Sequence, residues 1–333
     1  MLDNKYNINN PYLSVVVVAR NDDYGVRQID KINVFIKSLY FLVEKYKLFS
    51  ELIFVEWNPP ENNKFLYECL DIPKSNFIKS KFVIIPPEIH FTFLCSDKVK
   101  LFEYIGKNVG IRRSKGEFVL ITNPDNLIGE GIIKKISEKK LKYKHFYRVG
   151  RYNIKNIIPP ELSNYYLYLD FAQKNIEGWR GYIIYYSNIK FYIRYNPLKY
   201  IKGFLVNFLI PIFKYYPYQV PALCTPGDFI LMSKKDWLDI KGFLEIPPYS
   251  YTGGDGALVH IALKNKLKQV YWFNFNNTCL YSQPQFDREI IKEIHSLTKE
   301  EINICFQILK GNFKNFNNDR WGLKDYNLKE ISI

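Results

Sequence analysis

The chain has 333 residues, a formal net charge of +14, and 47% hydrophobic and 17% aromatic residues. This hydrophobic content is sufficient for a folded core, and the length suits one domain with a large insertion better than two complete domains. The positive charge favours an anionic partner, such as a diphosphate substrate or an anionic membrane surface. The sequence lacks zinc-ligand spacing, an aromatic RNA-binding signature and a basic zipper, so we expect no nucleic acid partner.

The cysteines and the chain start indicate the compartment. The five cysteines are scattered and include no C-x-x-C pair, which argues against a disulfide framework or a structural zinc site and fits a reducing compartment. Residues 1–10 are polar, so we expect no secretory signal. No run approaches the roughly 18 apolar residues that span a bilayer. We therefore expect a cytoplasmic protein that is able to rest on the inner face of a membrane.

The first part of the chain alternates between strand and helix patterns. Continuous β-branched and apolar runs predict buried strands at 13–19, 51–56, 81–85 and 117–122. Helices are predicted between them at 28–47 and 102–114. This order predicts an α/β fold with a mostly parallel central sheet flanked by helices.

The chain as a whole divides into four parts. Residues 1–153 are expected to form one half of a domain, and residues 222–288 the other half of the same domain. Residues 154–221 between them are crowded with aromatic side chains and are interpreted as an insertion, and residues 289–333 as a polar helical tail. In the second half, strands are predicted at 227–233 and 269–273, and helices at 234–241 and 257–265.

One apolar run within the insertion, residues 203–213, has lysines on both sides. It is too short to span a bilayer but is suited to lying on a membrane surface. Alternatively, this run is a helix buried in the core of the protein. Pro211 would interrupt a single long helix at this point.

Polar or acidic residues follow three of the four predicted strands, at 20–23, 56–58 and 123–125. Ligands of α/β sheets bind beyond the carboxyl ends of the strands. The last of these segments is Asn-Pro-Asp, and its Asp125 offers a hard oxygen ligand suited to Mg²⁺ or Mn²⁺ bound with a diphosphate. The alternative is a simple turn or helix cap, because all three residue types favour turns.

The predicted helix before the fourth strand is basic, with the sequence Lys107-Asn-Val-Gly-Ile-Arg-Arg113. Asn108 and one arginine of this helix could bind phosphate oxygens. A solvated basic helix face is the alternative. The four histidines have no visible orienting partner, so we expect each to have a packing or surface role.

Several segments, taken in order, resemble a bacterial group of GT-A-fold glycosyltransferase-like proteins related to the inverting family 2 transferases. They are Val15–Asp23, Leu52–Pro60, Pro86–His90, Lys107–Arg113, Gly116–Asp125 and Gly227–Met232. The match covers roughly residues 12–152 and 222–275. It implies a GT-A fold, a nucleotide diphosphate-sugar donor (UDP-sugar favoured) and a glycan or lipid-linked acceptor.

The resemblance also implies a role for individual residues. In the donor site, Ala19, Arg20, Asn21 and Asp23 would hold the base and ribose, and Glu56 would lie against the base. Asn108 and Arg112, expected at the phosphates from the basic helix itself, complete the predicted donor site. In the reaction centre, Asp125 would hold Mn²⁺ or Mg²⁺, Asn123 would face the ribose or sugar, Asp228 would face the donor sugar or acceptor, and Asp255 would deprotonate the acceptor hydroxyl.

The sequence departs from the pattern of this group in three places. The motif at 123–125 supplies one carboxylate instead of two, the loop around Asp255 is rich in glycine, and the segment 278–283 lacks a histidine that relatives tend to offer. A GT-A-like protein that binds a nucleotide sugar or glycan without turnover therefore remains an alternative.

Three other enzyme classes are disfavoured. A nucleotidyltransferase or a nicotinamide dehydrogenase would need a glycine-rich loop after the first strand, and none is present. A glycosidase would need paired carboxylates across a cleft, which the resemblance disfavours.

Overall fold

The computed structural model describes residues 5–22, 26–94, 96–97, 99–180, 227–245, 254–284 and 317–333. The strands are β1 Leu13–Ala19, β2 Ser50–Trp57, β3 Ile78–Ile85, β4 Phe118–Thr122, β5 Asn126–Ile128, β6 His145–Ile154, β7 Ile176–Arg180, β8 Phe229–Ser233, β9 Lys268–Trp272, β10 Cys279–Ser282 and β11 Lys329–Ser332. The helices are α1 Gln28–Lys45, α2 Leu66–Cys69, α3 Pro87–His90, α4 Glu103–Arg113, α5 Glu130–Ser137, α6 Tyr165–Lys174, α9 Lys234–Asp239, α10 Gly254–Lys264 and the 3-10 turn η1 Phe275–Asn277.

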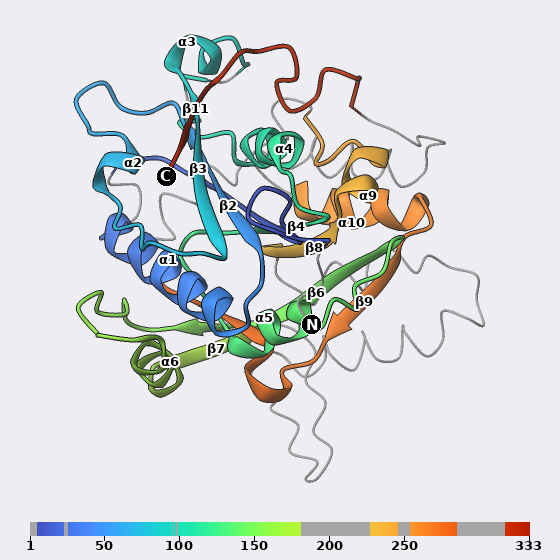
Figure 1. Ribbon diagram of the computed structural model, residues 1–333. Helices are drawn as coiled ribbons and strands as arrows, with labels where there is room; N and C mark the ends of the chain where they lie inside the picture. Colours follow the sequence, from blue (N-terminus) through green and yellow to red (C-terminus); the bar gives the residue numbers. More distant parts are fainter. Residues whose placement is uncertain are drawn as a thin grey trace, which may run out of the picture.

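All eleven strands belong to one sheet, and helices flank it (Figure 1). The strand order is β11-β3-β2-β1-β4-β8-β6-β10-β5, and β7 and β9 also pair with β6. Strands β3, β2, β1 and β4 are parallel neighbours, as predicted.

The sheet as a whole is mixed rather than mostly parallel, which corrects the prediction. Strand β8 runs antiparallel to both β4 and β6, β11 runs antiparallel to β3, and β5 and β7 also make antiparallel pairs. The ten-residue strand β6 was not predicted, because Arg148, Gly150 and Arg151 interrupt its apolar pattern. Arg148 is nevertheless only 1% exposed.

Two apolar clusters, one on each face of the sheet, form the core. One is built on α1, α5 and α6, and the other on α4, α9, α10 and part of residues 317–333. Helix α4 lies very close to β1 through two glycines. A Cβ atom on Gly110 would lie 2.3 Å from Val16 Cγ1, and one on Gly106 would lie 2.8 Å from Val18 Cγ1. This contact fixes the distance between α4 and β1. Strand β1 is followed by residues 20–23, the first predicted loop of the site.

The predicted elements before residue 122 are confirmed to within a few residues at each end. Helix α10 begins three residues earlier than predicted, at Gly254. Ser233 begins α9 as expected, because its hydroxyl accepts a hydrogen bond from the backbone N–H of Asp236 at 3.0 Å.

The later segments are described only in part. The C-terminal tail was predicted to be helical with turns after Gly311; residues 317–333 form turns, as expected there, and the strand β11, which was not predicted. Of the insertion, residues 154–180 include α6 and the strand β7, which extends the sheet from β6. Residues 181–226, with the apolar run at 203–213, lie outside the described residues, as do residues 285–316. Among the helices that the structure describes, none has the length and apolar character needed to cross a bilayer.

We predict that Gly110→Ala lowers the free energy of unfolding by about 1–3 kcal/mol, because the added methyl group must push α4 away from β1. This loss outweighs the gain of about 1 kcal/mol in helix propensity. Urea unfolding followed by circular dichroism measures it. Gly178→Ala in β7 is the matched control, because its nearest neighbour would be Asn153 Nδ2 at 4.0 Å. A Gly110→Ala protein as stable as the wild type would contradict the close packing of α4 on β1.

Candidate active site

The carboxyl ends of β1 and β2 bring together most of the residues predicted to bind the base and ribose. Ala19 at the end of β1 pairs in register with Glu56 of β2. Arg20 donates from Nε to a backbone carbonyl at the end of β2 at 2.6 Å, and Asn21 donates to a carbonyl of the loop after β2 at 2.6 Å. These four residues therefore lie at one edge of the sheet. Asp23 lies outside the described residues.

Glu56 is fully buried at this edge. Its two carboxylate oxygens each lie 3.0 Å from the backbone N–H of Leu66, at the start of α2. Burial raises the pKa of Glu56 to about 7, although the Leu66 N–H acts in the opposite direction. The carboxylate therefore holds the start of α2 beside the end of β1.

The second part of the site forms where β4 ends and β8 begins. Because these strands are antiparallel, with Thr122 opposite Phe229, Asp228 lies next to the Asn-Pro-Asp segment at 123–125. Asn126, the residue after that segment, donates from Nδ2 to Asp228 Oδ2 at 3.1 Å. Asp228 and Asp125 are 4% and 3% exposed. Two of the predicted aspartates are thus brought to one place although they lie 103 residues apart in the sequence.

Arg151 of β6 forms the centre of this site. Its Nη1 atom lies 2.7 Å from Asp228 Oδ2, and its charge also interacts with Asp125 and Asp255. Burial alone would lower the pKa of Arg151, but the carboxylates, Asp228 above all, raise it. Burial would likewise raise the pKa of Asp228, but Arg151 and Asn126 lower it, so this pair is held as an ion pair.

Asp255 lies in the first turn of α10, and its side chain lies against the backbone of Gly227, just before β8. A Cβ atom on Gly227 would lie 2.0 Å from Asp255 Oδ2, so only glycine fits there without moving this carboxylate. The hydroxyl of Tyr104 lies 3.5 Å from Asp255 Oδ1, a long contact for a hydrogen bond. The third predicted aspartate therefore also belongs to this site.

Two buried lysines add positive charge beside these carboxylates. Lys107 of α4 is 2% exposed, and its Nζ atom donates to Asn123 Oδ1 at 3.2 Å and lies 2.5 Å from Glu103 Oε1. Lys31 of α1 is 1% exposed and donates to the carbonyl oxygen of Pro284 at 3.3 Å. Burial lowers the pKa of Lys31, and the nearby Asp125 acts in the opposite direction.

The structure does not bring Asn108 and Arg112 to the strand ends. Asn108 is fully buried and exchanges hydrogen bonds with the backbone of Phe243, at 2.8 and 2.7 Å. Arg112 donates to backbone carbonyls of residues 319 and 321. For Asn108 the cause is its side of the helix, which faces Phe243. For Arg112 the cause is the direction of α4, which runs from the carboxyl ends of the strands back to their amino ends. Its first turns therefore face the site, and its last turn faces away from it.

Three buried polar atoms at the centre of the site have no hydrogen-bond partner among the residues that the structure describes: Asn126 Oδ1, Arg151 Nε and Asp228 Oδ1. Unpaired buried polar atoms cost about 1–3 kcal/mol each, so they usually indicate water or a ligand. The set offers two acceptors and one donor within one polar cluster. A sugar fits this chemistry, because each of its hydroxyls both donates and accepts.

The carboxylate that could hold a divalent cation here is that of Asp125, which also interacts with the charges of Lys31 and Arg151. Asp228 is already engaged by Arg151. In the described part of the chain, no group of three His, Cys, Asp or Glu side chains is placed to hold a metal. The donor set therefore fits Mg²⁺ or Mn²⁺ bound by one carboxylate together with substrate phosphates, and not a cage made by the protein alone.

Five residues of the site were missed by sequence reasoning: Lys31, Tyr104, Lys107, Asn126 and Arg151. Two of them had a signal, since Lys107 begins the basic segment and Asn126 directly follows the Asn-Pro-Asp motif. Arg151 had none, because the strand that carries it was not predicted.

No protein-family model matches the chain, and no curated protein matches it. Among solved structures, mannosyl-3-phosphoglycerate synthase from Rubrobacter xylanophilus is 11% identical with a TM-score of 0.45, over 97% of this chain and 86% of that one. A mycobacterial protein is 10% identical with a TM-score of 0.43, over 90% and 75% of the two chains. Residues 1–349 of S. aureus TarS are 15% identical with a TM-score of 0.39, over 89% and 69%. TM-scores this low do not establish a shared fold.

Proposed function

We propose that this protein is a GT-A-type glycosyltransferase that moves a sugar from a nucleotide diphosphate-sugar, preferably UDP-linked, to a glycan or lipid-linked acceptor. The observation that carries the proposal is the position of Arg151, whose charge interacts with Asp125, Asp228 and Asp255. These are the three aspartates that the resemblance assigns to metal, sugar and acceptor. The fold thus gathers them from three distant segments at one end of the parallel strands.

The donor would lie across the carboxyl ends of β1, β2 and β4. Residues 19–21 and Glu56 would bind the base and ribose, and Asn123 the ribose or the sugar. Lys107 takes the phosphate-binding role first expected of Asn108 and Arg112, because its ammonium group reaches Asn123 at 3.2 Å. The unpaired atoms of Asn126, Arg151 and Asp228 would receive sugar hydroxyls.

The reaction we propose is a single displacement with inversion. The acceptor hydroxyl oxygen bonds to the anomeric carbon, and the bond from that carbon to the diphosphate oxygen breaks. Asp255 takes the hydroxyl proton, and the nucleoside diphosphate leaves with the bonding electron pair. Lys107 stabilises the charge that develops on the leaving oxygen. A divalent cation bound by Asp125 and the phosphates would supply further positive charge there.

A lipid-linked acceptor would place this chemistry on the cytoplasmic face of a membrane. The support for that location is the net charge of +14, which attracts anionic surfaces. The apolar run at 203–213 belongs to the same hypothesis, which liposome flotation of the whole chain would test.

We predict that UDP binds to the wild-type protein more tightly with Mn²⁺ than with a chelator, as measured by isothermal titration calorimetry. Asp125→Asn should remove this metal dependence and leave the fold intact, because the substitution keeps the size of the side chain. Circular dichroism checks the fold. If neither UDP nor GDP binds at millimolar concentration, the proposed function is wrong. An unchanged metal dependence in the variant would place the cation elsewhere.

We predict that Lys107→Met weakens UDP binding by about 10-fold or more, since a hydrogen bond to a charged group is worth about 1.5–3 kcal/mol. Lys235→Met is the control for the loss of one positive charge, because Lys235 is exposed on α9 and, in the described part of the chain, pairs with Asp239 of the same helix. Its affinity for UDP should match that of the wild type. Equal affinities for Lys107→Met and the wild type would remove Lys107 from the donor site.

We predict that Asp255→Ala lowers the rate of sugar transfer or donor hydrolysis by roughly 100-fold or more, the usual scale for losing a positioned general base. UDP affinity should stay within about twofold, because Asp255 lies on the acceptor side. Asp239→Ala on α9 is the matched control, with a carboxylate engaged only by surface lysines. Wild-type turnover by Asp255→Ala would leave Asp255 only as a helix-capping residue.

A further inference from the structure

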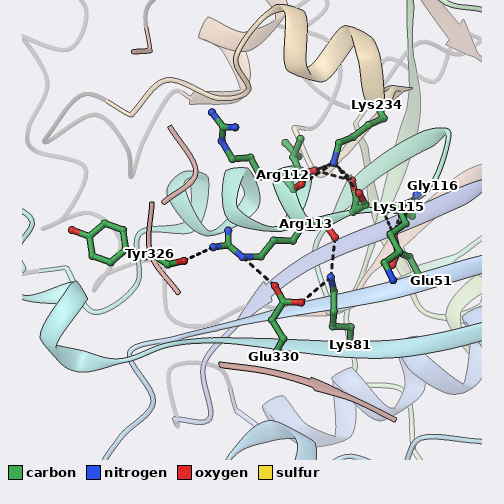
Figure 2. Close-up of polar contacts among 12 residues, drawn as sticks. Glu51, Lys81, Arg112, Arg113, Lys115, Gly116, Lys234, Tyr326 and Glu330 are labelled. Atoms are coloured by element: carbon green, nitrogen blue, oxygen red, sulfur yellow. Dashed lines mark hydrogen bonds and ion pairs between the residues drawn. The ribbon is translucent and has the colours of Figure 1, made fainter. Parts of the chain in front are cut away.

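The C-terminal segment, residues 317–333, is fastened along the outer side of α4. Arg113 donates to the carbonyl oxygens of Gly322, Leu323 and Tyr326 at 3.1–3.2 Å, and its Nε lies 3.2 Å from Glu330 Oε1. Figure 2 shows the pairing of Arg113 with Tyr326 and Glu330, and of Glu330 with Lys81 on β3. Strand β11 then closes the edge of the sheet by pairing with β3.

Between α4 and this segment lies a short loop, residues 242–245. Asn317 donates to the carbonyl oxygen of Phe243 at 2.5 Å and accepts from the backbone N–H of Glu245 at 3.0 Å. Asn108 of α4 binds the same loop from the opposite side. The side chain of Glu245 joins the two sides, because its Oε1 atom accepts from Asn108 Nδ2 at 2.7 Å and from the N–H of Gly322 at 2.8 Å.

The loop in turn covers Lys107. The ring of Phe243 lies 5.8 Å from Lys107 Nζ and packs on the ring of Tyr104, with the ring centroids 5.2 Å apart. Phe243 is fully buried. A continuous chain of contacts therefore runs from the C-terminal segment through Glu245 and Phe243 to the lysine that faces Asn123.

We propose that the C-terminal segment is a positioning element of the active site, which holds Lys107 in place through the 242–245 loop. The importance of Lys107 for transfer rests on the proposed function, whereas its placement by the segment does not. Neither Glu245 nor Asn317 touches the strand-end residues, so both are positioning residues. Helix α4 carries both Asn108, which contacts the loop, and Lys107, which is held in place, because these two residues are adjacent in the sequence.

Two substitutions of Glu245 and one control substitution test this proposal. Glu245→Ala removes both hydrogen bonds at Oε1. Glu245→Gln keeps an oxygen at that position, and it is a close mimic because burial raises the pKa of Glu245 to about 7. Asp319→Ala is a control within the same segment, because it breaks only the 2.8 Å surface pair with Lys241.

The test is lysine acetylation of the full-length folded protein with a water-soluble ester, quantified for individual lysines by peptide mass spectrometry. Lys107 should be protected in the wild type and should react about 10-fold faster or more in Glu245→Ala. Lys31 is the internal reference, because it is equally buried but lies on α1, on the opposite face of the sheet. Its reactivity should not change. Glu245→Gln and Asp319→Ala should both protect Lys107 as the wild type does.

Two results would overturn the proposal. The first is that Lys107 stays protected from acetylation in Glu245→Ala. The second is an equal rise in the acetylation rates of Lys31 and Lys107, which would indicate general loosening of the fold. A separate experiment measures the UDP affinity of the same variants by titration. Glu245→Ala should lose affinity as Lys107→Met does, and Glu245→Gln should not. A wild-type protein that binds no UDP yet gives the expected labelling would refute the proposed function and leave the coupling intact.

Discussion

The side chain of Arg151 is only 14% exposed and its charge interacts with three aspartates, and a largely buried charge of this kind requires nearby opposite charge. Asp228 satisfies most of the requirement through a direct contact, and Asp125 and Asp255 contribute from further away. The same arrangement keeps the Asp228 carboxylate ionised despite its burial, by lowering its pKa. Losing Arg151 or Asp228 would leave the other charge of this direct pair uncompensated, at a cost of about 3–5 kcal/mol for a buried pair. The ends of β4, β6 and β8 are therefore held together by the charges that would handle the substrate.

The sequence was sufficient to predict the parallel half of the sheet and the residues that end its strands. Continuous β-branched runs, such as residues 13–19, mark strands buried on both faces, and the polar residues after them mark the ligand edge. It was not sufficient for β6, whose arginines break the apolar pattern although they are buried in the fold. Arg151 could not be placed without that strand, because its role depends on a neighbour 77 residues away. Of the strands that make antiparallel pairs, β8 was predicted at 227–233, whereas β5, β7 and β11 were missed, since strands of three to five residues leave little periodic signal.

The expectation for Asn108 and Arg112 shows a different limit. Their residue types suited phosphate binding, but a helix between parallel strands runs opposite to them, so only its first turns approach the carboxyl ends. Lys107 is near enough to that end to reach Asn123, whereas Arg112 lies near the amino ends of the strands. There, the neighbouring residues Lys115 and Gly116 bind Glu51 at the start of β2 (Figure 2). Helix direction, which the element order already implied, would have placed Arg112 away from the site before any coordinates were known. Asn108 is adjacent to Lys107, so it is the side of the helix, not the helix direction, that turns Asn108 toward Phe243.

Helix α4 makes a different contact on each of three faces. Gly106 and Gly110, four residues apart, form the face that lies on β1, and their lack of side chains brings the helix close enough for its neighbours to reach the strand ends. Tyr104 and Lys107, three residues apart, face Asp255 and Asn123. Asn108 and Arg112, again four apart, bind the 242–245 loop and the C-terminal segment. Because a helix moves largely as a rigid body, a displacement on any one of these faces is transmitted to the other two. Residues 317–333 are in this way connected through α4 to the proposed reaction centre.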